Sequence, residues 1–228
     1  MTELRDISIE KDYTTMSLSS VLYTSGETKV LITTSVSDFL PRWLVGENYG
    51  WVTAEYSMLP GSSPQRVNRS SYEKGRSKEI SRLIGRSLRT VVDLEKIDGL
   101  SVTVDCDVLQ ADGGTRTAAI NGAWIALKDT FQKLVQNKTI KEDPILGQIA
   151  AVSVGVLDGK ICLDLDYSQD SNADVDLNIV MTSEGEFIEI QGTGEDSNRT
   201  ERHGYRVGNN EACHDQGKAD HQRDSSWY

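Results

Sequence analysis

Apolar and polar residues alternate along several stretches of the chain, which is the pattern of strands with one buried face. The clearest alternation spans residues 101–110, and its apolar positions are Val102, Val104, Cys106 and Val108. A turn at Gly26 separates two β-rich runs within residues 21–36, and residues 51–59 form another such run. The first half of the chain therefore predicts a β-sheet that buries one of its faces.

Two other segments carry apolar residues at helical spacing. In residues 117–135 the apolar stripe consists of Ile120, Trp124, Leu127, Phe131 and Leu134, beside a flank of small residues at Ala118, Gly122 and Ala126. In the second half of residues 66–89 the stripe consists of Ile80, Leu83, Ile84 and Leu88. We expect a loop to lead into this second helix.

The last predicted elements are two hairpins. Asp158-Gly159 separates β-rich residues 150–158 from 160–167, and Gly185 separates 175–182 from 186–193. Strands and helices thus follow one another in an order that predicts one α+β (mixed α/β) domain over residues 1–194. Apolar periodicity then ends, and we expect residues 195–228 to form a polar, disordered tail.

Charge and composition narrow the function. The 228 residues contain 24 Lys and Arg against 35 Asp and Glu, a net charge of -11, so a site for nucleic acid must be local. No apolar run reaches the roughly 20 residues of a membrane span, and no signal pattern opens the chain, so a cytoplasmic location away from membranes is expected. The cysteines form no CxxC pair, and all the histidines fall in the tail: His203, His214 and His221. Histidine triads and histidine-ligated zinc are therefore excluded from residues 1–194, and the cysteines indicate neither a disulfide framework nor a zinc site.

The sign of the charge reverses in residues 66–89. Six arginines and two lysines face only Glu73 and Glu79 there: Arg66, Arg69, Lys74, Arg76, Lys78, Arg82, Arg86 and Arg89. A guanidinium group matches the oxygens of a phosphate, so the predominance of arginine favours phosphate recognition. The alternative is a solvated helix face with scattered salt bridges.

A glycine-rich turn joins the strand 101–110 to the helix that follows. The run Gly113-Gly114-Thr115-Arg116-Thr117 offers backbone N–H groups, two hydroxyls, a guanidinium and the positive end of a helix dipole, which together suit an anion. A phosphate is the expected ligand, and a turn without a ligand is the alternative.

Aspartates gather near the predicted strand 160–167 and after it, at Asp164, Asp166, Asp170, Asp174 and Asp176. A solvated strand face and a turn would explain Asp164 and Asp166. The spacing does not fit an EF-hand, whereas Mg²⁺ shared with substrate phosphates needs only one or two carboxylates, for which we expect Asp170 and Asp176. A carboxyl among carboxyls can also keep its proton and act as a general acid. These three groups together predict a site that cuts or joins phosphodiesters.

Longer runs of the sequence resemble bacterial ribonuclease PH, in order over residues 1–194. They are WVTAEYSMLP, KEISRLIGRSLR, VTVDCDVLQADGGTRTAAINGA, AAVSVGV, and DSNADVDLNIVMT with IEIQGT. The resemblance implies a phosphate-dependent 3′–5′ exoribonuclease, a nucleotidyltransferase that trims the 3′ ends of tRNA precursors and other RNAs and releases nucleoside diphosphates reversibly. It also implies a ring of six identical subunits, a trimer of dimers.

The resemblance assigns roles by position. Inorganic phosphate, the co-substrate, would be bound by Arg76, Gly114, Thr115 and Arg116. Asp170 and Asp176 match the catalytic carboxylates, which also bind Mg²⁺ or Mn²⁺, and Asp170 is the candidate proton donor. Arg66 and Arg69 match residues of a basic loop that contacts RNA.

The chain departs from the family pattern in two regions. It starts later, the loop between Pro60 and Arg76 is shorter, and Gly61 stands where a basic residue is common, which predicts a weaker grip on RNA. The family ends in an amphipathic helix that covers a sheet, but residues 195–228 show no apolar stripe, as a shifted reading frame would produce. The alternative function is therefore a non-catalytic or assembly-impaired RNA-binding ring subunit of the same fold.

Overall fold

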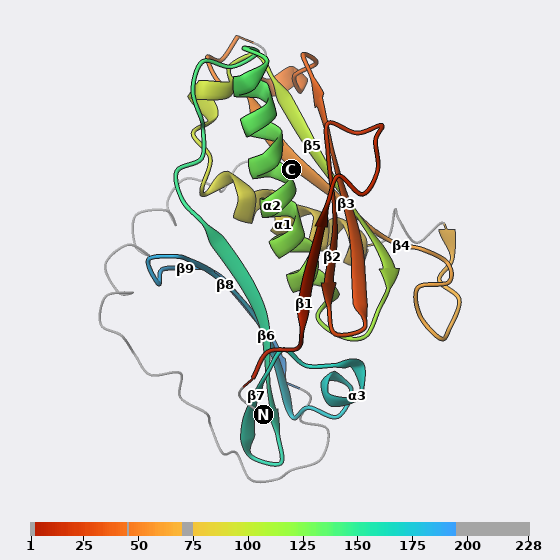
Figure 1. Ribbon diagram of the computed structural model, residues 1–228. Helices are drawn as coiled ribbons and strands as arrows, with labels where there is room; N and C mark the ends of the chain where they lie inside the picture. The colour runs from red at the N-terminus through yellow and green to blue at the C-terminus, as the bar shows by residue number, and fades with distance from the viewer. Residues whose placement is uncertain (1–2, 45, 70–74, 195–228) are drawn as a thin grey trace, which may run out of the picture. The chain divides into compact units, whose positions relative to one another are not determined.

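The computed structural model describes residues 3–44, 46–69 and 75–194. The predicted tail 195–228, with its histidines, lies outside the described residues. Within them, two sheets and two long helices make up the fold (Figure 1), and no helix is long and apolar enough to cross a membrane. The predicted α+β class is confirmed.

The first sheet has five strands in the order β1-β2-β3-β5-β4, and only β4 and β5 run parallel. The strands are β1 (Ile7–Lys11), β2 (Ser19–Ser25), β3 (Thr28–Ser37), β4 (Trp51–Met58) and β5 (Ser101–Gln110). Short 3-10 helices at Arg42–Leu44 and Leu94–Ile97 flank β4 and β5. The alternation predicted in β5 is present, because its four apolar positions are buried. Strand β1 was not predicted.

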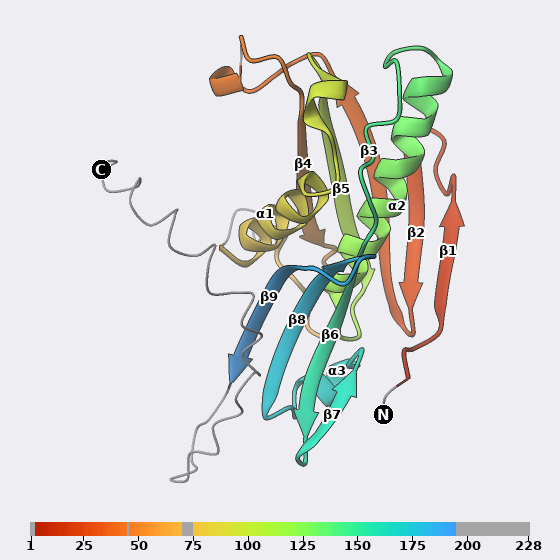
Figure 2. The same ribbon diagram turned by 90° about the vertical axis from the view of Figure 1, so that its left-hand side faces the viewer.

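Helices α1 (Gly75–Arg89) and α2 (Thr115–Gln136) pack against the first sheet and bury the core between them (Figure 2). Both predicted stripes face this core, where Ile84 and Phe131 are fully buried, and only Trp124 is half-exposed. At Gly122 a Cβ atom would collide with the side chain of Ile32, so the small-residue flank lets α2 approach the sheet closely.

The second sheet has four antiparallel strands in the order β7-β6-β8-β9. They are β6 (Ile149–Leu157), β7 (Lys160–Leu163), β8 (Val175–Thr182) and β9 (Phe187–Gly194). The strand predicted over residues 160–167 is wrong beyond Leu163. Asp164 has a φ of 52°, which ends the strand, and Asp166 forms the capping box of a short helix, α3 (Tyr167–Asp170).

One side chain of α2 ties the second sheet to the first layer. Asn121 Nδ2 donates to the carbonyl oxygen of Ala151 on β6 at 2.9 Å, and the Ala151 N–H donates to Asn121 Oδ1 at 2.7 Å. Strand β7 begins to pair with β6 only at Val154, so it does not reach Ala151. The amide of Asn121 therefore satisfies the strand there as a neighbouring backbone would.

Candidate functional site

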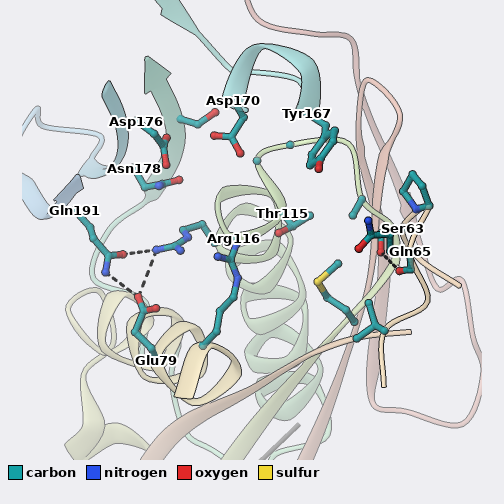
Figure 3. A pocket seen from close by; sticks show the side chains of 18 of the residues that line it. Ser63, Gln65, Glu79, Thr115, Arg116, Tyr167, Asp170, Asp176, Asn178 and Gln191 are labelled. Carbon is teal, nitrogen blue, oxygen red and sulfur yellow. Dashed lines mark hydrogen bonds and ion pairs between the residues drawn. The ribbon is translucent and has the colours of Figure 1, made fainter. Parts of the chain in front are cut away.

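A cavity of about 830 Å³ is lined by residues of both sheets, α1, α3 and the beginning of α2 (Figure 3). Seven of the eight predicted site residues line it: Arg66, Arg76, Gly114, Thr115, Arg116, Asp170 and Asp176. The eighth, Arg69, is exposed and is not part of the lining. The three groups that the sequence suggested separately thus converge on one cavity.

The glycine-rich turn has the backbone that an anion site needs. Gly113 and Gly114 have φ values of 70° and 61°, a region that residues with a side chain rarely adopt. A Cβ atom at Gly113 would also collide with the carbonyl oxygen of Leu165. No side chain caps α2 at Gly114, so the N–H groups of the first turn of α2 are available to a ligand at the positive end of a 22-residue helix.

Arg116 is held in place by two neighbours across the cavity. Its Nη1 lies 3.4 Å from Glu79 Oε1 on α1 and donates to Gln191 Oε1 on β9. Gln191 Nε2 in turn donates to Glu79 Oε1 at 2.8 Å, which closes a three-membered network (Figure 3). The Arg116 side chain is 15% exposed, so its guanidinium is oriented before any ligand arrives.

Arg76 also lines the cavity but is engaged differently. It is the second residue of α1, and none of the hydrogen bonds or ion pairs found among the described residues involves it. The charges of Arg76 and Arg116 both counteract the rise that burial causes in the pKa of Tyr56 and of Asp176. The two guanidinium groups therefore influence the same part of the cavity. Arg76 is therefore a cation at the cavity that none of the described contacts ties to the fold.

Two other arginines of this helix contact the fold instead of the cavity. Arg86 Nη2 lies 2.7 Å from Glu189 Oε2, and Arg89 stacks 4.3 Å above the ring of Trp51 and donates to the carbonyl oxygen of Val52 at 2.8 Å. The prediction of phosphate recognition by the whole stretch is therefore wrong for these two arginines, for which the alternative of a helix face with salt bridges is closer.

Asp170 and Asp176 occupy the opposite wall of the cavity (Figure 3). Burial, and secondarily the charge of Asp170, raises the pKa of Asp176, although Arg116, Arg76 and Asn178 act in the other direction. Asp176 Oδ1 is buried and has no hydrogen-bond partner among the described residues. Such an acceptor costs free energy until a proton, a cation or a donor reaches it.

Two of the other aspartates build structure. Asp164 was expected on a solvated strand face, but it is 8% exposed and its Oδ1 lies 2.6 Å from Arg5 Nη2. Burial alone would raise its pKa, yet the hydrogen bonds from Arg5 and Ser25 outweigh burial and lower the pKa. Asp166 caps α3. The expectation for Asp164 was wrong because Arg5, far away in sequence, supplies the opposite charge.

The donor set fits a magnesium ion only as a pair of carboxylates. The described part of the chain contains no group of three or more His, Cys, Asp or Glu side chains that could bind a metal by themselves. Mg²⁺ keeps several waters and binds through one or two carboxylates together with substrate phosphates. Asp170 and Asp176, with the unpartnered Oδ1 of Asp176, satisfy this requirement, and Mg²⁺ remains a prediction.

Sequence reasoning missed the neutral and acidic residues that complete the site. Ser153, Asn178 and Gln191 form one row across β6, β8 and β9, and all three line the cavity. The alternation in β8 was a usable signal, because Asp176 and Asn178 are two residues apart and so share a face. Glu79 follows Arg76 by three residues on α1, which places both on one side of the helix.

Comparisons with known proteins identify the family and agree with the fold. Residues 3–131 match the 3′ exoribonuclease family, domain 1, and residues 147–203 match domain 2 of the same family. An exosome structure from Archaeoglobus fulgidus with RNA bound to the active site is similar, with a TM-score of 0.72 and 22% identity over 85% of this chain and 79% of that one. Rrp46 from rice (Oryza sativa) has a TM-score of 0.65 and 20% identity over 84% of this chain and 82% of its own. An archaeal exosome core has a TM-score of 0.66 and 20% identity over 85% and 76% of the two chains.

Proposed function

Because the chain belongs to the 3′ exoribonuclease family, we propose that it is a phosphate-dependent 3′–5′ exoribonuclease of the kind represented by bacterial ribonuclease PH. Its substrates would be 3′ ends of RNA such as those of tRNA precursors, and its products nucleoside diphosphates. One observation carries the proposal: two arginines from separate helices, a carboxylate at the end of α3 and a carboxylate on β8 line one cavity at the uncapped start of α2.

The reaction follows from the placement of these groups. Inorganic phosphate binds to Arg76, Arg116 and the N–H groups at Gly114 and Thr115, and one of its oxygens attacks the phosphorus of the last phosphodiester. The bond from phosphorus to the 3′ oxygen breaks, and Asp170 donates a proton to that oxygen. The bond made resembles the bond broken, so the reaction runs backward when nucleoside diphosphates are abundant.

The carboxylate wall has a second role. Asp170 and Asp176 would hold Mg²⁺ or Mn²⁺, which when bound offsets negative charge that develops on the transferred phosphoryl group. The unpartnered Asp176 Oδ1 supports this assignment. Burial and the charge of Asp170 raise the pKa of Asp176, so its ionised form is disfavoured in the absence of a bound cation.

We further propose that the RNA strand reaches the cavity along Arg66 and Arg69. Arg66 lines the cavity, and Arg69, three residues later, is exposed. The active protein would be a ring of six copies. The likeness to an exosome with RNA bound to its active site supports RNA as the ligand.

The second candidate is a non-catalytic RNA-binding subunit of such a ring. It is favoured by the likeness to Rrp46 and to an archaeal exosome core, whose fold this chain shares at 20% identity. The complete set of arginines and carboxylates in the cavity favours the enzyme.

One experiment separates these candidates. The purified protein is incubated with a 3′-extended RNA and Mg²⁺, with and without inorganic phosphate, and its size in solution is measured in the same buffer. The proposal predicts nucleoside diphosphates only when phosphate is present. Nucleoside monophosphates formed without phosphate would show hydrolysis instead, and RNA binding without any product would indicate the non-catalytic subunit.

A further inference from the structure

A buried ion pair lies directly behind the anion-binding turn. Arg5 Nη2 donates to Asp164 Oδ1 at 2.6 Å, and the backbone N–H of Arg5 donates to Asp164 Oδ2 at 3.0 Å. Ser25 Oγ donates to the same Oδ2 at 3.0 Å. The two charged side chains are only 17% and 10% exposed, so this pair is shielded from solvent and held by more than charge alone.

The same pair contacts the backbone of the turn. Arg5 Nη1 donates to the carbonyl oxygen of Asp112 at 2.6 Å. A Cβ atom at Gly114 would lie 3.0 Å from Arg5 Nη2 and 3.6 Å from Asp164 Oδ1, so the guanidinium and the carboxylate lie against the last residue before α2. The pair therefore touches the turn on both sides of Gly113.

A buried threonine completes the support. Thr28 Oγ1 donates to the carbonyl oxygen of Gly113 at 2.7 Å and accepts from the N–H of Asp112 at 2.9 Å. Thr28 is fully buried at the β2–β3 turn. Two long-range contacts thus fix the turn: Arg5 with Asp164, and Thr28.

Asp164 also connects the turn to the opposite wall of the cavity. It precedes the capping residue Asp166 by two positions, and α3 ends in Asp170. The N–H of Tyr167 lies 3.3 Å from Asp112 Oδ1, which joins α3 to the turn directly. Asp164 itself does not line the cavity, so its effect on a ligand must be indirect.

We propose that Arg5 and Asp164 are positioning residues, which hold the Gly113–Gly114 turn so that the first N–H groups of α2 and Arg116 meet an inorganic phosphate. The assignment of phosphate as the ligand rests on the proposed function. Two glycines with positive φ have many alternative conformations, and a turn free to adopt them would lose the aligned donors. The ion pair removes that freedom before the ligand binds.

The test is Asp164→Asn, which keeps the size of the side chain and removes its charge. We expect the KM for phosphate and the Kd for inorganic phosphate, measured by calorimetry, to rise about tenfold, while kcat changes by less than about threefold. Arg5→Lys should restore part of the affinity that Arg5→Gln loses, because it keeps the charge but not the second donor.

A matched control is Asp129→Asn. Asp129 is 15% exposed and pairs with Lys133 at 2.9 Å, but it lies 14 residues after Thr115 on α2, about 21 Å along the helix. Its loss should lower Tm while leaving the Kd for phosphate unchanged. An equal rise of the Kd in both variants would show a general loss of stability and would overturn the positioning role, as would an unchanged Kd in folded Asp164→Asn.

Ser25→Ala keeps the test informative if Asp164→Asn does not fold. It leaves the ion pair intact and removes one hydrogen bond to Asp164, so we expect a two- to threefold weaker binding of phosphate, about 0.5 kcal/mol. An unchanged Kd would contradict the proposal. The Kd is measured without RNA, so a wild-type protein that binds phosphate but releases no diphosphates would refute the proposed function and leave the positioning role standing.

Discussion

The two walls of the cavity are built on opposite principles. The turn wall consists of the Gly113–Gly114 turn and Arg116. Arg116 contacts Glu79 and Gln191, and Arg5 and Asp164 contact the turn on its side away from the cavity. The carboxylate wall consists of Asp170 and Asp176. Asp176 has a raised pKa, and its buried Oδ1 has no hydrogen-bond partner among the described residues. The side chain of Arg116 thus has partners within the protein, whereas one oxygen of Asp176 has none among the described residues.

This difference separates groups that are oriented before a ligand binds from a group that lowers the stability of the folded protein. Donors aimed at an anion stabilise it most when they need not reorganise, and the contacts of Arg116 and of the glycine turn hold such donors in place. Burial, and secondarily the charge of Asp170, raises the pKa of Asp176, so the ionised form of this side chain lowers the stability of the folded protein. Removing the buried charge of Asp176 should therefore raise stability, whereas changes at the other site residues should act on the rate or on phosphate binding, and the predictions below test that contrast.

The largest effect should come from Asp170→Asn. The amide cannot donate a proton as a carboxylic acid does, so we expect kcat for phosphate-dependent trimming to fall about 1,000-fold, with little change in Tm. Single-turnover assays with a 3′-extended RNA measure the rate. The exposed Asp174, which lies between α3 and β8, supplies the control, because Asp174→Asn should keep full activity. Retention of more than a tenth of the rate in Asp170→Asn would remove Asp170 from the mechanism.

Next in size is Arg76→Gln. Arg76 makes no contact that the fold needs among the described residues, so Tm should stay the same while the KM for phosphate rises about 30-fold. Arg82→Gln is the matched variant, since Arg82 is exposed on the same helix and lies outside the cavity lining. If both variants raise the KM equally, the effect belongs to the general charge of α1 and not to a phosphate contact.

A smaller effect is expected for Glu79→Gln. The neutral side chain can still accept from Gln191, but it no longer balances the charge of Arg116, so the guanidinium is oriented less firmly. We expect phosphate to bind about threefold more weakly. Titration calorimetry with inorganic phosphate checks this, with Glu189→Gln, which disturbs the Arg86 pair, as the control. Tighter binding in Glu79→Gln would mean that Glu79 competes with phosphate for Arg116.

The smallest effect is on stability, in Asp176→Asn. Because burial and Asp170 raise the pKa of Asp176, the folded protein binds this proton more tightly than the unfolded chain does. The carboxyl therefore lowers stability as pH rises through its folded pKa and has no such effect below the usual pKa of an aspartate. Without metal or phosphate, Tm of Asp176→Asn should exceed that of the wild type by a few degrees at pH 7 and match it in acid. A lower Tm at pH 7 would contradict the contrast between the walls.

Local patterns in the sequence were sufficient for most elements. The alternation in residues 101–110 and the stripe in residues 117–135 each follow from one buried face, and both elements have that face. The strand predicted over residues 160–167 was wrong beyond Leu163, because Asp164 adopts a positive φ and pairs with Arg5, a contact between distant parts of the chain that a local pattern does not contain.

The candidate site could be predicted to the same extent and for the same reason. Gly114 and Arg116 lie in one run, so the turn was visible, and so was the nearby pair Asp170 and Asp176. Gln191 was not, because a glutamine on a strand acquires a role only when the second sheet brings it to Arg116. Composition likewise could not separate Arg76, which faces the cavity, from Arg86 and Arg89, which support the fold.

The two hydrogen bonds between Asn121 and Ala151 have a consequence for motion. They are the amide counterpart of a strand pair, so any swinging of the second sheet away from α2 must break both at once. The deuterium-exchange rate of the Ala151 N–H would thus report how often the second sheet separates from α2. Asn121→Ala would remove both hydrogen bonds without changing any side chain that lines the cavity.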